Sequence, residues 1–196
     1  MTQVALEVPR SAFRVRALSV VLGAVLVALA AQVSIPLPGT PVPMTLQPMA
    51  VLLVGGLLGG TLGALSMILY LAMGAAGLPV FTPTVPLIGV ARLFGPTGGY
   101  LLAYPIAAYA VGAIVPPRRS AERGSGGEDW TRVALAVLAG LVLIHLGGLA
   151  QLAILTGSLS AAARFGTWPF LLGDLLKLAV LVPVLTKLTP TIRARL

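Results

Sequence analysis

The segment from Gly77 to Tyr100 reads GLPVFTPTVPLIGVARLFGPTGGY, and it separates two long apolar parts of the chain. Prolines at positions 79, 83, 86 and 96 prevent a regular helix here, so the segment must be a loop between helices. It carries one charged residue, Arg92. Long loops in compact proteins are often functional, which makes this a candidate binding loop. A surface loop followed by a helix cap would also explain its prolines and glycines.

The GPTGGY end of the segment predicts the start of the next helix. Thr97 is a typical N-cap residue, and the free N–H groups of a first helical turn can bind an anion. Gly98 and Gly99 have no side chains, so we expect a ligand to approach this backbone closely. Tyr100 belongs to the same turn. These residues are therefore candidate ligand contacts.

The composition indicates an integral membrane protein. Hydrophobic residues make up 58% of the 196 residues, charged residues make up 9%, and the mean hydropathy is +1.02. So little polar surface cannot cover a soluble globule of this size. The net charge of +8 does not indicate nucleic acid binding, because the basic residues lie at the ends of apolar runs. There is no cysteine, which excludes thiol chemistry and thiolate metal ligands.

The apolar runs predict a single all-α domain of six transmembrane helices in one bundle. We expect the spans at residues 17–35, 45–58, 61–76, 97–115, 132–155 and 169–188. The second and third are separated by a tight turn at Gly59-Gly60. Residues 116–131 are the hydrophilic part of the chain and predict a flexible linker, whereas 36–43 and 156–166 predict connecting loops.

The basic residues predict the orientation of the bundle. If the N-terminus lies inside, the outer loops contain only Arg92 and Arg164, and the inner side contains ten basic residues: Arg10, Arg14, Arg16, Arg118, Arg119, Arg123, Arg132, Lys187, Arg193 and Arg195. Cytoplasmic loops carry an excess of Lys and Arg. Both termini and the 116–131 linker are therefore expected on the cytoplasmic side, and the 77–96 loop outside.

Several polar residues of the spans then fall in the outer half of the bundle. Gln47 begins the second span, Tyr70 lies in the outer half of the third, and Asp174 and Lys177 lie in the first turns of the sixth. An ionised side chain within a membrane costs about 2.5–3.5 kcal/mol even on insertion scales, so such residues are usually functional. This distribution predicts a binding pocket that opens outward.

Asp174 and Lys177 are the strongest candidates for ligand contacts. They are three residues apart and share one helix face. The carboxylate accepts hydrogen bonds from N–H groups and the ammonium donates to a carbonyl oxygen, so a ureido or amide ring would use both. A mutual ion pair that only neutralises the two charges is the alternative.

Two weaker features allow a structural interpretation as well. His145 lies in the fifth span, where a hydrogen-bonded structural histidine is the simpler interpretation; without a second histidine it predicts no metal site. Ala24 and Ala28 are four residues apart on the first span, and such pairs let helices approach closely. They predict either internal packing or a docking face for another membrane protein.

The chain resembles the BioY family, whose members are the biotin-binding S components of energy-coupling-factor (ECF) transporters. The resemblance rests on PMTLQ at 43–47, YL at 70–71 with Gly74, GLPVF at 77–81, GPTGGY at 95–100, and PF at 169–170 followed by Gly173-Asp174 and Lys177.

The resemblance implies a six-helix S-component fold that captures biotin at the outer face of a prokaryotic cytoplasmic membrane. It also implies a transmembrane T component and two cytoplasmic ATPases as partners, with Ala24 and Ala28 on the docking face, and no enzyme activity or cofactor. Asp174, Lys177 and the loop ending at Tyr100 map to ligand contacts, and Arg92 and Gln47 less firmly. The alternatives are an S component for riboflavin or thiamine, and a membrane enzyme that uses His145 and Asp174.

Overall fold

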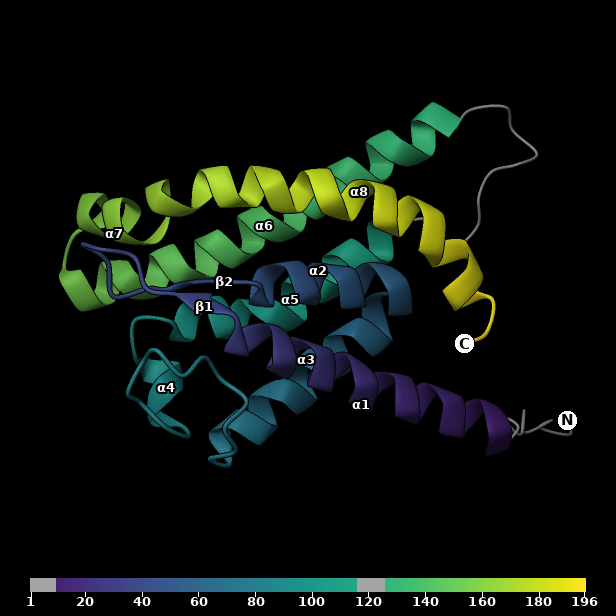
Figure 1. Cartoon of the computed structure of the whole chain (residues 1–196), viewed down its shortest axis with the longest axis horizontal. Coiled ribbons are helices and arrows are strands. Elements are labelled where there is room, and N and C mark those ends of the chain that lie inside the picture. Colours follow the sequence, from purple (N-terminus) through teal and green to yellow (C-terminus); the bar gives the residue numbers. More distant parts are fainter. Residues whose placement is uncertain (1–9, 116–125) are drawn as a thin grey trace, which may run out of the picture.

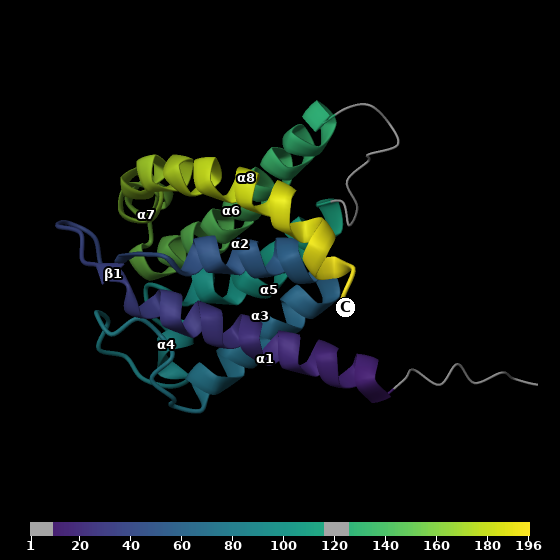
Figure 2. The same ribbon diagram turned by 45° about the vertical axis from the view of Figure 1, so that its right-hand side comes forward.

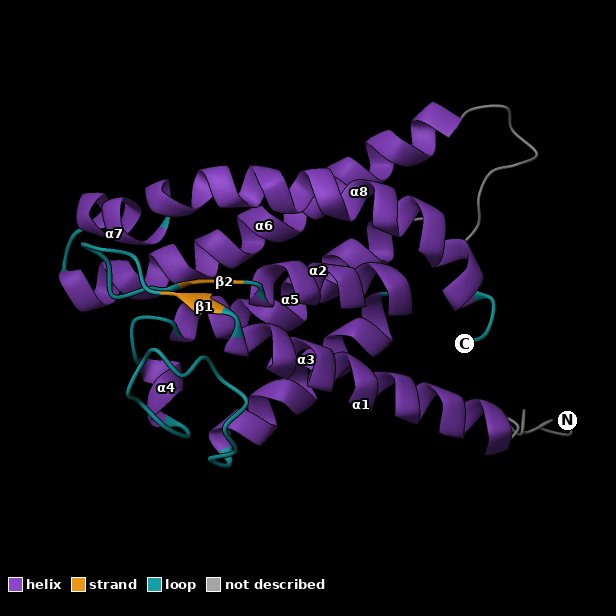
Figure 3. Ribbon diagram, viewed as in Figure 1, coloured by secondary structure: helices purple, strands orange, loops and turns teal. Residues whose placement is uncertain are grey.

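The computed structural model describes residues 10–115 and 126–196. Figures 1 and 3 show an almost entirely helical molecule with one short hairpin. The longer helices are α1 (Arg10–Gln32), α2 (Gln47–Leu58), α3 (Gly60–Ala75), α5 (Gly98–Ile114), α6 (Gly126–Thr156) and α8 (Leu171–Arg193). The short elements are β1 (Ser34–Ile35), β2 (Met44–Thr45), α4 (Ala91–Phe94), α7 (Leu159–Gly166) and the 3-10 helix η1 (Trp168–Phe170).

Helix α5 lies at the centre of the bundle and contacts α2, α3 and α6. Helix α1 packs on α2 and α3, and α8 packs on α2 and α6. Two views show that α4, α7 and the hairpin gather at one end of the bundle (Figures 1 and 2). The first turns of α1 and the last turns of α8 lie at the other end. The bundle therefore has one end built from loops and short elements, and this end holds the cavity described below.

The helices have the length and surface of membrane spans. Three helical stretches of the described residues are long and apolar enough to cross a bilayer: Ser11–Gln32, Asp129–Thr156 and Leu159–Arg193. Three shorter apolar helices, α2, α3 and α5, pack among them. Large apolar side chains such as Leu22, Leu146 and Leu172 are exposed on the outside of the bundle. A helical bundle with apolar side chains both inside and outside is an integral membrane protein.

The expected helices agree with the observed ones where a glycine or proline marks a boundary. Gly59 has a φ of 87° and turns the chain between α2 and α3. Three connecting segments differ from expectation, the 77–96 loop because it contains α4. The 156–166 segment contains α7, because Ser158 caps its N-terminus through a 3.3 Å bond from the Ala161 N–H, and alanines favour helix. The 36–43 connector joins the antiparallel pair β1–β2.

The linker expected at 116–131 is shorter than predicted. Helix α6 already begins at Gly126, so residues 126–131 are helical rather than flexible. The remaining linker residues, 116–125, lie outside the described part of the chain. Helix α5 continues through Pro105.

Ala24 and Ala28 face the inside of the bundle. The Ala24 side chain is completely buried, and Ala28 packs partly buried against the same core. The neighbouring Gly23 lies against Ser66 of α3 and Val54 of α2. Because the Ala24 side chain has no exposed surface, the structure favours internal packing over a docking face at this position. The small residues of α1 allow close packing within the chain itself.

Replacing Ala24 by Trp should therefore destabilise the bundle. An indole at a completely buried position forces neighbouring helices apart, and overpacking typically costs about 1–3 kcal/mol or more. Thermal unfolding of the detergent-purified protein measures the effect. Val25→Trp is the matched control, because Val25 is adjacent on α1 and 39% exposed. Equal melting temperatures for the two variants would contradict the inward orientation of Ala24.

Arg193 fixes the end of α8 that lies far from the cavity. Its guanidinium donates hydrogen bonds of 2.7 and 2.9 Å to the Gly56 and Gly112 carbonyls and one of 2.9 Å to Val115. The Gly56 and Gly112 carbonyls belong to the last turns of α2 and α5, and Val115 directly follows α5. Carbonyls at the end of a helix have no hydrogen-bond partner within that helix. A cation at two helix C-termini is favourable, so Arg193 ties α8 to the bundle centre.

Candidate ligand-binding site

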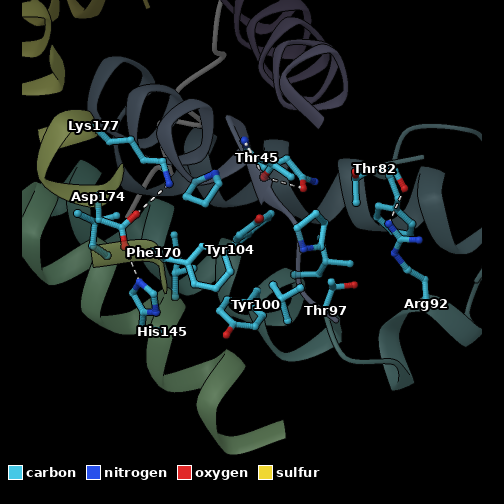
Figure 4. Close-up of a pocket in the computed structure, with 18 residues that line it drawn as sticks. Thr45, Thr82, Arg92, Thr97, Tyr100, Tyr104, His145, Phe170, Asp174 and Lys177 are labelled. Atoms are coloured by element: carbon cyan, nitrogen blue, oxygen red, sulfur yellow. Dashed lines mark hydrogen bonds and ion pairs between the residues drawn. The ribbon is translucent and has the colours of Figure 1, made fainter. Parts of the chain in front are cut away.

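A partly open cavity lies at the loop end of the bundle. Its lining residues come from β2 and the adjoining connector, the 77–97 loop, and helices α2, α5, α6 and α8. Most of the residues singled out from the sequence line it: Gln47, Arg92, Thr97, Tyr100, Asp174 and Lys177. Polar residues from distant parts of the sequence thus converge on one space (Figure 4).

Asp174 is the centre of a polar cluster at one side of the cavity. Its Oδ1 accepts a 2.8 Å hydrogen bond from the Lys177 ammonium, and its Oδ2 lies 2.6 Å from His145 Nε2. Asp174 and Lys177 are each 7% exposed. The two residues lie on α8 one helical turn apart, and His145 reaches the carboxylate from α6. The cluster combines a hydrogen-bond acceptor and donors in a nearly dry site, where such interactions are strong.

Aromatic and aliphatic side chains form the middle of the cavity wall. Tyr100 and Tyr104 of α5 and Phe170 of η1 lie between the Asp174 cluster and Arg92 in Figure 4. The hydroxyl of Tyr100 donates a 2.6 Å hydrogen bond to the Gly166 carbonyl, so this side chain also ties α5 to the end of α7. A flat, mostly apolar ligand would pack against these rings.

Gln47 lines the cavity, whereas Tyr70 supports it from behind. The amide of Gln47 donates to the Tyr70 hydroxyl, and its carbonyl oxygen accepts a 3.2 Å bond from Thr45. Thr45 belongs to β2 and lines the cavity as well. Tyr70 is completely buried and packs edge-on against Phe81. It therefore orients a cavity residue without lining the cavity itself.

Arg92 holds the 77–96 loop together from the inside. Its guanidinium donates to the backbone carbonyls of Thr82, Val85 and Leu87, with 2.6 Å to Thr82 and 3.2 Å to Leu87. The side chain is 1% exposed and lies over the Phe81 ring at 5.9 Å. Burial lowers the pKa of this guanidinium from its usual value. Within the described residues, no carboxylate forms an ion pair with Arg92, so its positive charge remains available to the cavity.

The GPTGGY turn has a different structural role from the one expected. Thr97 occupies the N-cap position, but its hydroxyl makes no capping hydrogen bond; it is buried without a partner and lines the cavity. Gly98 packs against the Leu93 backbone, and Gly99 against the Gly147 backbone of α6. Neither glycine lines the cavity. At both glycines, neighbouring backbone occupies the space that a side chain would fill, so close packing within the chain accounts for them, and ligand contact at these positions stays a prediction.

Two residues of this region were not among the predicted ligand contacts. His145, interpreted as a hydrogen-bonded structural histidine, does form such a bond with Asp174, 29 residues away, and it also lines the cavity. Gln151 donates hydrogen bonds of 3.0 and 2.7 Å to the Leu93 and Gly95 carbonyls and so fixes the turn before Thr97. The sequence signal for both was available: each is a polar residue within an otherwise apolar helix.

The fold and the cavity together define a class of protein. A helical membrane protein that encloses a cavity with charged residues at two sides and aromatic walls is a membrane-embedded receptor or carrier for a small polar-ended molecule. Among the described residues, no three His, Cys, Asp or Glu side chains are close enough to hold a metal ion. The cavity therefore offers hydrogen bonds, charge and apolar surface for ligand binding.

The chain belongs to the BioY family, whose family model matches residues 6–194. A relative from Pyrococcus horikoshii, named "Probable biotin transporter BioY", is 37% identical over 83% of this chain and 89% of its own. The "Biotin transporter BioY" of Thermotoga maritima is 34% identical over 79% and 84%. That of Rhodobacter capsulatus is 34% identical over 80% and 83%.

The fold matches a solved structure as well. The crystal structure of the S component for biotin from an ECF-type ABC transporter superposes with a TM-score of 0.78 at 24% identity, covering 92% of this chain and 94% of the other. The chain thus has an S-component fold, and its family role is transport. The interpretation as a membrane enzyme that uses His145 and Asp174 is wrong, because the family to which the chain belongs consists of transporters.

Proposed function

We propose that this protein is the S component that binds biotin for uptake across the cytoplasmic membrane of a prokaryote. The observation that carries the proposal is the Asp174–Lys177 pair at one side of a mostly apolar cavity, with Arg92 at the other. Biotin has matching parts: a ureido ring that donates two N–H groups and accepts at its oxygen, an apolar bicyclic body, and a carboxylate. The names of the relatives support the same ligand.

The arrangement of the cavity favours one orientation of the ligand. The ureido N–H groups donate to the Asp174 carboxylate, and the Lys177 ammonium donates to the ureido oxygen. The bicyclic body packs against Tyr104 and Phe170. The carboxylate lies toward Arg92 and the unpartnered hydroxyl of Thr97, which supplies a donor. Gln47 contributes a further polar group to the wall between the two ends.

The mechanism requires that the loop end of the bundle faces outward. We place six spans in the membrane, with both termini cytoplasmic, following the distribution of basic residues. Biotin enters from outside, and the 77–96 loop closes over it as a lid. Release inside requires a transmembrane T component and two cytoplasmic ATPases, because nothing in a binding cavity supplies energy for uphill transport. Ala24 is not part of the surface that contacts them.

A thermal-shift experiment tests the ligand assignment. The detergent-purified protein is heated with biotin, riboflavin or thiamine, each at the same concentration. Biotin should raise the melting temperature, because a ligand at 1,000 times its Kd stabilises the folded state by about 4.1 kcal/mol. Riboflavin and thiamine should leave it unchanged. Stabilisation by one of them and not by biotin would replace the proposed ligand with another vitamin.

A further inference from the structure

We propose that His145 is a positioning residue that holds the Asp174 carboxylate in the orientation needed to receive a ligand with N–H donors. The inference rests on the proposed function and extends it to a residue outside the sequence motifs. Its starting point is the 2.6 Å contact between His145 Nε2 and Asp174 Oδ2, which joins α6 to α8 across the cavity wall.

The hydrogen bonds of Asp174 determine which His145 nitrogen carries the proton. Oδ1 accepts from the Lys177 ammonium at 2.8 Å, and a cation at this distance favours the ionised carboxylate, whose two oxygens are both acceptors. His145 Nε2 must therefore be the donor to Oδ2. In a neutral imidazole the other nitrogen, Nδ1, is then an acceptor, and this atom is buried without a hydrogen-bond partner. The geometry thus assigns the Nε2–H tautomer.

The surroundings of the imidazole keep it in place. Its ring lies 6.2 Å from the Tyr100 ring, nearly edge-on, and 6.4 Å from the Phe170 ring. These two rings come from α5 and η1, and Tyr100 is itself fixed by its bond to the Gly166 carbonyl. The packing of α5, α6 and η1 therefore determines where His145 Nε2 meets the carboxylate oxygen of Asp174.

Lys177, the other partner of Asp174, does not hold the carboxylate in one orientation. Lys177 is on the same helix and has a long, flexible side chain, so the ammonium alone does not fix the plane of the carboxylate. Without His145, the carboxylate can rotate about its Cβ–Cγ bond and turn its remaining lone pairs away from the cavity. With Oδ2 held by His145 and Oδ1 by Lys177, each oxygen keeps free lone-pair capacity for a ligand N–H. His145 therefore favours a ligand that presents two N–H groups together, as a cyclic urea does.

Two variants separate positioning from packing. His145→Gln keeps a terminal N–H donor that can reach Asp174, and His145→Phe keeps a ring but has no donor. The ligands are biotin and desthiobiotin, which retains the ureido ring but lacks the sulfur-containing ring. We expect His145→Phe to weaken both ligands by about tenfold or more and by the same factor, and His145→Gln to restore affinity to within about threefold. If His145→Phe binds normally while His145→Gln is weak, the ring only packs and the proposal is wrong.

A measurement without biotin tests the geometry separately. His145 is the single histidine of the chain, so ¹⁵N-histidine labelling reports on it alone. The ligand-free protein should show the Nε2–H tautomer, and Asp174→Asn should change the imidazole signals. An Nδ1–H tautomer, or signals unaffected by Asp174→Asn, would overturn the positioning role. Failure of the wild-type protein to bind biotin, with the expected tautomer present, would count against the proposed ligand instead.

Discussion

Asp174→Asn and Lys177→Met should each weaken biotin binding at least tenfold, which corresponds to about 1.4 kcal/mol or more. Each change removes one hydrogen-bond partner of the ureido ring, and hydrogen bonds to charged groups typically contribute about 1.5–3 kcal/mol. Isothermal titration calorimetry of the purified variants measures the loss. Lys187→Met is the matched control for the lysine, because Lys187 lies on the same helix but is exposed.

Stability must be measured alongside affinity in these variants. Removing one partner of a buried ion pair leaves an uncompensated charge and often costs about 3–5 kcal/mol. The double variant Asp174→Asn/Lys177→Met removes both charges and should recover most of the stability without recovering biotin binding. Normal affinity in the double variant would show that the pair merely neutralises itself, as a structural ion pair does.

Arg92→Gln should loosen the 77–96 loop and weaken biotin binding together. The guanidinium donates to three backbone carbonyls of this loop, and glutamine cannot reproduce that fork of donors. Hydrogen exchange of residues 82–87 should accelerate in the ligand-free variant, and biotin should protect these residues in the wild-type protein. Arg164→Gln, at an exposed arginine of α7, is the matched control.

A carboxylate-free ligand separates the two roles of Arg92. If Arg92 also attracts the ligand carboxylate, wild-type protein should bind biotin more tightly than biotin amide, and Arg92→Gln should abolish this preference. A preference that survives the substitution would restrict Arg92 to holding the loop. Unchanged exchange at 82–87 would show that the loop does not depend on its internal arginine.

The fold could be predicted from the sequence where local chemistry determines it. The Gly59-Gly60 turn and the prolines of the 77–96 loop fix boundaries through backbone geometry, and the structure places helix ends close to them. Helix α7 was missed because its Ser158 cap lies in a short run of small residues that resembles a loop. The orientation of α1 could not be predicted, since apolar residues surround the whole helix and leave no polar face to mark the outside.

In the candidate site, too, contacts within one helix could be predicted from the sequence and contacts between helices could not. Asp174 and Lys177 are adjacent on one helix turn, so their pairing follows from sequence spacing alone. The contact of Asp174 with His145 depends on how α6 packs against α8, which no local pattern specifies. Gly98 and Gly99 illustrate the converse: glycine marks a close approach, but the sequence does not say whether a ligand or another helix approaches.

The position of bound biotin is the most direct test of the central claim. A structure of the protein with biotin should show the ureido ring within hydrogen-bond distance of Asp174 and Lys177, the bicyclic body against Tyr104 and Phe170, and the carboxylate toward Arg92 and Thr97. Biotin bound in this cavity with its ureido ring at Arg92, or bound outside the cavity, would contradict the account.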